Sequence, residues 1–348
     1  MSREGKPLWR KLLLLIAGLA FVILVLPTLI VVGFGQEEAR QEAVRRQEMI
    51  RLQPQPGEPA VSVYLSEEER VVHIPLERYV RGVVAAEMPV EFSLEALKAQ
   101  AIASRTYIVQ RMIQGDFSDV PQGAMVTDTP QHQAFLDDAA LKARWGLAYE
   151  KNMEKLTKAV EETRGQVLTY EGKPIYAAFF STSNGYTENA DEYWEGGGLP
   201  YLTSVPSPWD AHSPKFRQRV EIPLEEFFAK LSLDPAVAAS GDGEPWIEIV
   251  SKTAGQRVKE VRVGEQVLTG RQVREALGLN STDFTVQIKG DTLVFTTTGY
   301  GHGVGMSQYG ADGMAKEGKT AEEILRHYYR GVELADYRQW IKKTGGEV

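Results

Sequence analysis

The chain begins with an uncharged apolar segment, and the longer remainder mixes apolar and polar positions with helical and strand periods. Residues 12–35 carry no charged side chain, and about 20 apolar helical residues cross the hydrocarbon core of a membrane. Residues 1–11 are rich in Lys and Arg, a bias that keeps a segment in the cytoplasm. The pattern predicts a single-pass transmembrane anchor in the cell membrane, with a short cytoplasmic tail and an extracytoplasmic C-terminal part.

A cleaved signal peptide is the alternative for this segment. Its apolar region would be shorter, and the chain offers only the weak cleavage site Val32-Gly33-Phe34, so an uncleaved anchor is favoured. Residues 36–53 are charged and helix-prone, which is typical of a stalk. Prolines at 54, 56 and 59 end any helix. The linker therefore spans residues 36–59, and an ectodomain follows over residues 60–340.

The ectodomain alternates between strand and helix patterns. Apolar periodicity and turn signals predict strands at 61–63 and 71–74, helices at 76–86, 94–113 and 153–163, and a hairpin beginning at 166. Residues 220–298 mix further strands with short helices, and form either a second lobe or an insertion. A capping box at Thr320 and Glu323 starts a last helix. The predicted fold class is α+β, with a substrate cleft.

Composition excludes several classes of function. The 348 residues carry a net charge of −8 and no cysteine. An acidic chain has no general attraction for nucleic acid. Without cysteine the chain has no disulfide, no thiolate zinc site and no cysteine nucleophile.

A glycine-rich motif, GYGHGVGMSQYGA at 299–311, is the first candidate site. Val304 breaks the dinucleotide-binding pattern and Tyr309 breaks the nucleophile elbow. What remains is a glycine-lined strand-to-helix turn that presents His302, Ser307, Gln308 and Tyr309. These polar and aromatic groups suit a sugar. A purely structural turn, with His302 hydrogen-bonded to backbone, is the alternative.

A second candidate is FFSTSNGYTENADEYW at 179–194. Ser181 and Ser183 stand at a predicted strand end, and Asn184-Gly185 is a strong turn signal. Acidic residues follow at 188–192. The segment forms either a hydroxyl-rich cleft wall with acidic and aromatic groups or an ordinary solvated hairpin loop, and composition alone favours the loop.

Glu87 is the third candidate, because it is the only charge between Arg81 and Glu91. A carboxyl group in apolar surroundings has a raised pKa, and a general acid working near neutral pH needs that property. A solvent-exposed helix end is the alternative for Glu87, and the local pattern does not decide between them.

Together these segments resemble the stage II sporulation protein D (SpoIID) family, whose domain also occurs in amidase enhancers. The resemblance covers about residues 60–335, and GHGVGMSQYGA is its most specific motif. It implies a lytic transglycosylase that cleaves the β-1,4 bond between N-acetylmuramic acid and N-acetylglucosamine in peptide-stripped glycan strands. The product would carry a 1,6-anhydro-muramoyl end, and the reaction would serve forespore engulfment during sporulation.

The resemblance also implies roles for single residues. The family's catalytic glutamate falls on Glu87. Some relatives bind zinc through a histidine and two cysteines; His132 matches that histidine, but the cysteines are missing. We therefore expect no metal and no cofactor, and a hydrogen-bonding His132 that steadies the cleft. The expected substrate-binding residues are Gln100, Arg105, Ser181, Ser183, His302, Gln308 and Tyr309.

Partners follow from the same resemblance. They are peptidoglycan glycan strands, an amidase or endopeptidase of the engulfment machinery, and a membrane scaffold protein in the septal or engulfing membrane of the mother cell. Two other functions stay open: a wall-binding module that activates a separate amidase, and a scaffold that only recruits partners. Glu87 favours the enzyme over the binding module, and the glycine-lined polar motif disfavours the scaffold.

Overall fold

A computed structural model describes residues 8–21, 52–194, 196, 198–239 and 246–341. The chain divides into two compact units, Met1–Leu52 and Gln53–Val348. Helix α1 (Leu8–Ala20) belongs to the first unit. Within the described ranges, no helix combines the length and the apolar character that a membrane crossing requires. The transmembrane helix is therefore unsupported by the structure, although residues 22–35 of the predicted anchor lie outside the described residues.

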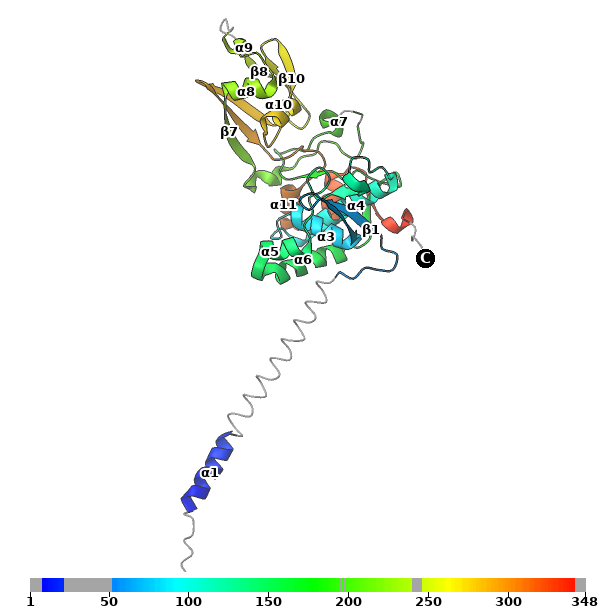
Figure 1. The fold of residues 1–348 in the computed structure, drawn as a ribbon, viewed down its shortest axis with the longest axis vertical. Coiled ribbons are helices and arrows are strands. Elements are labelled where there is room, and N and C mark those ends of the chain that lie inside the picture. Colours follow the sequence, from blue (N-terminus) through cyan, green and yellow to red (C-terminus); the bar gives the residue numbers. More distant parts are fainter. Residues whose placement is uncertain (1–7, 22–51, 195, 197, 240–245, 342–348) are drawn as a thin grey trace, which may run out of the picture. The chain divides into compact units, whose positions relative to one another are not determined.

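Helix α4 (Leu94–Gln114) lies among the other helices in the helical part of the larger unit (Figure 1). Helices α3 (Leu76–Glu87), α6 (Tyr149–Glu161), α11 (Gln308–Lys316) and α12 (Ala321–Tyr328) pack against it. Its small residues Ala96, Ala99, Ala101 and Ala103 are fully buried, which allows close approach of these neighbours. Because α4 is covered on several sides, four of its polar residues are buried together with apolar ones: Gln100, Ser104, Arg105 and Thr106.

Most helices predicted for this unit are confirmed, with small shifts at their ends. Thr320 and Glu323 form the predicted capping box of α12. Helix α6 starts earlier than predicted, and α5 (Asp138–Trp145) was not predicted from the sequence. Asp137 caps α5 by accepting a hydrogen bond from the backbone of Ala140. The mixture of helices and short sheets confirms the α+β class.

Short sheets surround the helices. Strands β1 (Ala60–Leu65) and β2 (Arg70–Pro75) form the predicted antiparallel pair, and β3 (Val126–Thr127) joins β1 in parallel. The hairpin of β4 (Gln166–Tyr170) and β5 (Lys173–Pro174) pairs with β14 (Glu333–Asp336). The two-residue strands β6 (Phe179–Phe180) and β13 (Met306–Ser307) pair in parallel. This last pairing joins the two polar motifs of the sequence.

Residues 217–298 form a lobe with its own hydrophobic core. One sheet has the order β11-β12-β7 and the other β10-β9-β8. Phe227, Val261, Phe284 and Phe295 are buried between these sheets and their helices. The elements of this lobe are β7 (Arg217–Pro223), α8 (Leu224–Leu231), α9 (Ala236–Ala239), β8 (Ile247–Lys252), β9 (Val258–Val263), β10 (Gln266–Thr269), α10 (Gly270–Leu277), β11 (Phe284–Lys289) and β12 (Thr292–Thr298).

Candidate functional site

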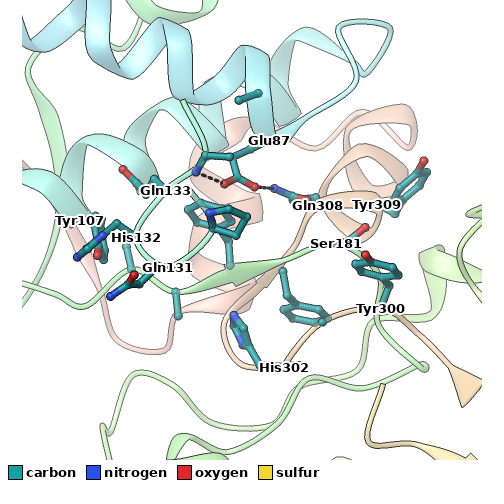
Figure 2. A pocket seen from close by; sticks show the side chains of 18 of the residues that line it. Glu87, Tyr107, Gln131, His132, Gln133, Ser181, Tyr300, His302, Gln308 and Tyr309 are labelled. Carbon is teal, nitrogen blue, oxygen red and sulfur yellow. Dashed lines mark hydrogen bonds between the residues drawn. The ribbon is translucent and has the colours of Figure 1, made fainter. Parts of the chain in front are cut away.

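Glu87 is the last residue of helix α3, immediately before the helix turns into an extended segment at Met88. Its carboxylate accepts a hydrogen bond from the backbone N–H of Ala134 at 2.9 Å through Oε1. The side-chain amide of Gln308 lies 3.5 Å from Oε2. Figure 2 shows the carboxylate of Glu87 pointing toward Gln308, and both residues line a cavity. The helix end, the loop before Phe135 and helix α11 therefore all fix the position of Glu87.

The surroundings of Glu87 favour its neutral form. Burial raises the pKa of this carboxyl, and the Ala134 N–H, the Gln308 amide and the positive charge of Lys215 oppose the rise without cancelling it. Ionisation in a poorly solvated position is costly, which is the cause of the shift. Glu87 therefore holds its proton to a higher pH than an ordinary glutamate.

The cavity beside Glu87 has a volume of about 560 Å³, within the range of small-molecule sites. Segments from distant parts of the sequence form its wall. The structure brings Glu87, His132, Ser181, His302, Gln308 and Tyr309 of the predicted site together along this wall. Aromatic residues that the sequence analysis did not single out complete it: Tyr107, Tyr176, Phe180, Trp194 and Tyr300.

The glycine-rich motif lines part of the cavity and then continues into helix α11. Gly299, Gly301, Gly303 and Gly305 all have positive φ angles, which glycine adopts without strain. Ser307 then caps helix α11, and its side chain accepts from the backbone of Gly310. The first residues of that helix, Gln308 and Tyr309, line the cavity.

Gly305 should be the glycine of this motif that tolerates substitution least. A Cβ atom there would lie 2.0 Å from the carbonyl oxygen of Ala178. Gly172 is a matched control, because it has a similar φ of +73° and no atom within 4 Å of such a Cβ. We expect Gly305→Ala to lower the free energy of unfolding by about 2–4 kcal/mol and Gly172→Ala by about 1 kcal/mol. Urea unfolding measures both, and equal losses would contradict the packing argument.

His302 lines the cavity and also forms a hydrogen bond with backbone. The sequence suggested these two features as alternatives, and the structure combines them. Its Nδ1 accepts a hydrogen bond from the N–H of Val304 at 3.0 Å. Burial, helped by the charges of Arg274 and Arg257, lowers its pKa to about 3. The ring packs 5.4 Å from that of Trp194. His302 is therefore a neutral aromatic part of the wall.

Ser183, which the sequence predicted to contact substrate, is not among the residues that line the cavity. Its hydroxyl donates to Asp210 Oδ2 at 2.9 Å and to the carbonyl of Ser207 at 2.8 Å, and it has no exposed surface. Asp210 also accepts from the hydroxyl of Ser307, the residue that caps helix α11. Asp210, which the sequence analysis missed, thus joins the serine loop to the helix that carries Gln308.

Gln100 and Arg105 are also buried away from the cavity. The Gln100 amide donates to Ser104 within helix α4 at 3.0 Å. Arg105 forms a two-pronged ion pair with Glu77, with contacts of 3.0 Å from Nε and 2.6 Å from Nη2. Both side chains have no exposed surface. The structure does not bring these two predicted site residues to the cavity, because α4 presents their positions to other helices.

The acidic loop at 188–192 does not reach the cavity either. Glu188 is buried and accepts hydrogen bonds from the Thr253 hydroxyl and from the Gly255 N–H. Arg257, fully buried in the same junction, donates to the carbonyl of Tyr186 at 3.2 Å. The loop therefore fastens the 217–298 lobe against the glycine-rich motif. A role for its carboxylates beside the substrate is not supported.

His132 lines the cavity and is held by hydrogen bonds, as expected. Its Nδ1 accepts from the backbone N–H of Thr127 at 3.3 Å, and Nε2 lies 3.0 Å from Asp119 Oδ2. Since Nδ1 accepts from Thr127, Nε2 is the ring nitrogen that can donate to Asp119. Across the described ranges, no three His, Cys, Asp or Glu side chains are grouped so that they could hold a metal ion.

Comparison with known proteins places this chain in a family. The family model described as "Stage II sporulation protein" matches residues 64–170. Stage II sporulation protein D of Bacillus subtilis is 43% identical over 93% of this chain and 96% of its own length. The Bacillus amyloliquefaciens protein of the same name is 43% identical over 96% of this chain and 98% of its own length.

A more distant relative has a different name. The amidase enhancer of Bacillus subtilis is 31% identical over 74% of this chain and 40% of its own length. The motifs quoted above and these identities lead to one assignment: this chain belongs to the stage II sporulation protein D (SpoIID) family.

Proposed function

We propose that this protein is a lytic transglycosylase that cleaves the β-1,4 bond between N-acetylmuramic acid and N-acetylglucosamine in peptide-stripped glycan strands. The observation that carries the proposal is a single carboxyl group, Glu87, with a raised pKa at the edge of a sugar-sized aromatic cavity. Among the described residues that line this cavity, Glu87 is the only Asp or Glu. Hydrolases of this bond usually use two carboxylates, so a reaction that needs one fits better.

Glu87 would act twice in this reaction. In its neutral form it donates a proton to the glycosidic oxygen, and the bond between that oxygen and muramoyl C1 breaks. The resulting carboxylate takes the proton of the muramoyl C6 hydroxyl, whose oxygen bonds to C1. Atoms balance without water, and Glu87 ends the cycle protonated again. The amides of Ala134 and Gln308 stabilise the intermediate carboxylate, and the aromatic wall binds the sugar rings.

Analysis of the products by mass spectrometry tests this proposal. The full chain in detergent is incubated with peptide-free glycan strands, and the new ends are identified. We expect 1,6-anhydro-muramoyl ends. Reducing ends would instead indicate hydrolysis and would overturn the transglycosylase assignment.

The raised pKa of Glu87 predicts how cleavage depends on pH. Cleavage needs the protonated acid, so activity is present below the folded-state pKa and falls as pH rises through it. Gln308→Leu removes a donor that favours the carboxylate, so the falling limb should move to higher pH. Gln131→Leu, which changes another glutamine of the cavity wall, is the control and should leave the limb in place. A shift to lower pH in Gln308→Leu would contradict the assignment of Glu87 as the acid.

An amidase-activating function is the second candidate, because one relative is named an amidase enhancer. In that case the cavity would bind glycan without cutting it. An assay of a partner amidase with and without this protein distinguishes glycan cleavage from amidase activation. Faster amidase action that is unchanged in Glu87→Gln, with no new glycan ends, would favour the enhancer.

The proposed cellular setting is forespore engulfment in sporulation. Residues 12–35 would anchor the chain in the septal or engulfing membrane, with residues 1–11 in the cytoplasm. An amidase or endopeptidase would supply stripped glycan, and a membrane scaffold protein would hold the enzymes together. Membrane fractionation of sporulating cells that express the full chain or a form lacking residues 12–35 tests the anchor; equal membrane association would contradict it.

A further inference from the structure

Lys215 lies at the rim of the cavity, in the segment between the short 3-10 helix Pro208–His212 and strand β7. Its Nζ lies 4.7 Å from the centroid of the Tyr300 ring, which also lines the cavity. A cation over an aromatic face is attracted to it. In the part of the chain that the structure describes, no carboxylate lies within ion-pair distance of this ammonium group. Lys215 is therefore oriented by a ring and leaves its charge available to a ligand.

The charges around the cavity form a simple pattern. Lys215 is the only Lys or Arg, and Glu87 the only Asp or Glu, among the described residues of the wall. His302 is neutral because burial lowers its pKa to about 3, and Nδ1 of His132 accepts a hydrogen bond from Thr127. The positive charge of Lys215 is felt at Glu87, whose pKa it lowers against the effect of burial. A ligand in this cavity therefore meets one positive charge, that of Lys215, which suits a single anionic group.

We propose, building on the proposed function, that Lys215 binds the free lactyl carboxylate of muramic acid and thereby selects glycan from which the stem peptide has been removed. In intact peptidoglycan this carboxyl forms an amide bond with the peptide and has no charge. Once the amide is cleaved, the lactyl group is the one carboxylate on the muramoyl sugar. A single ammonium group at the rim thus favours the product of an amide-cleaving reaction over its precursor, by charge and by the smaller size of the free group.

Two matched glycan fragments test the proposal. They differ only in the lactyl group, which is a free carboxylate in one and is amide-linked to alanine amide in the other, so that the second fragment carries no carboxylate. We expect the full wild-type chain to have a lower KM for the free form. Lys215→Gln should raise this KM about tenfold, the usual scale for a hydrogen bond to a charged group, with little change for the amide form. Lys215→Arg should keep most of the preference, and Lys289→Gln, on the exposed end of β11, should keep all of it.

The same variants and fragments distinguish direct binding of the lactyl carboxylate by Lys215 from an indirect effect through Glu87. If Lys215 acted only through the pKa of Glu87, Lys215→Gln would move the pH profile and change the rates on both fragments equally, which would overturn the proposal. Calorimetric binding of the two fragments to each variant adds a readout that needs no cleavage. A wild-type chain that binds the free form more tightly but cuts neither fragment would refute the proposed function and leave the carboxylate site standing. Equal binding of the two fragments would refute the site.

Discussion

Glu87→Gln should reduce glycan cleavage by a factor of about 10²–10⁴, the range that a positioned general acid contributes. Glutamine keeps the size and polarity of the side chain but has no acidic proton that it can transfer to the glycosidic oxygen. It can still pack at the end of α3, so binding of the strands should change little. The loss should therefore fall on kcat rather than on KM. Initial rates of anhydro-end formation on peptide-free strands measure the effect.

A nearby glutamate provides the control for this experiment. Glu91 lies four residues further along the chain and is exposed, and it does not line the cavity. Glu91→Gln removes the same charge and should keep near wild-type rates. Circular dichroism and urea unfolding of both variants exclude loss of the fold. If Glu87→Gln cleaved as fast as Glu91→Gln, the assignment of the acid would be wrong.

Arg105→Ala should lower the free energy of unfolding by about 3–5 kcal/mol, because it leaves the Glu77 carboxylate buried without its partner. Both side chains are almost fully buried, and Arg105 also donates to the carbonyl of Gln166 at 3.1 Å. The pair joins helices α3 and α4 to strand β4, so its loss affects the centre of the unit. Urea unfolding measures the change.

An exposed ion pair gives the comparison. Arg326 and Glu322 are separated by 2.7 Å on helix α12, with more than half of each side chain exposed. Such pairs contribute about 0.3–0.5 kcal/mol, so Arg326→Ala should change stability little. A loss of less than about 1 kcal/mol in Arg105→Ala would contradict the structural role assigned to Arg105 and would revive its predicted contact with substrate.

The sequence was sufficient for the elements whose patterns are local. Amphipathic periodicity located the helices around residues 76–86 and 94–113, and the capping box located α12. Glu87 was found because a single charge in an apolar segment is a local signal. The glycine-rich motif was also recognisable, since its four successive turn glycines have positive φ angles that glycine adopts without strain.

Long-range packing explains the residues that were misassigned. Arg105 stands at the edge of the apolar face of its helix, where a snorkelling or cleft-facing side chain is the usual expectation. Other helices cover that edge of α4, so the side chain meets Glu77 instead of solvent. Glu188 likewise meets partners from a distant part of the chain instead of solvent, because Thr253 and Gly255 lie in the 217–298 lobe. No sequence pattern in helix α4 or in the acidic loop indicates these partners.

The aromatic wall was missed for a related reason. Tyr107, Tyr176, Trp194 and Tyr300 come from four separate segments that meet only in the folded chain. A single tyrosine in a helix or loop carries no signal of a shared cavity. The segment at 179–194 was interpreted either as a cleft wall with aromatic groups or as a solvated loop, and its Trp194 does line the cavity.

The source of the oxygen at the new glycan end distinguishes lytic transglycosylation from hydrolysis. Cleavage of peptide-free strands is carried out in water enriched in heavy oxygen, with the full wild-type chain and with Glu87→Gln. A transglycosylase joins the muramoyl C6 oxygen to C1, so the new ends should carry no heavy oxygen and should be absent with Glu87→Gln. New ends that contain heavy oxygen from the solvent would show hydrolysis and contradict the account.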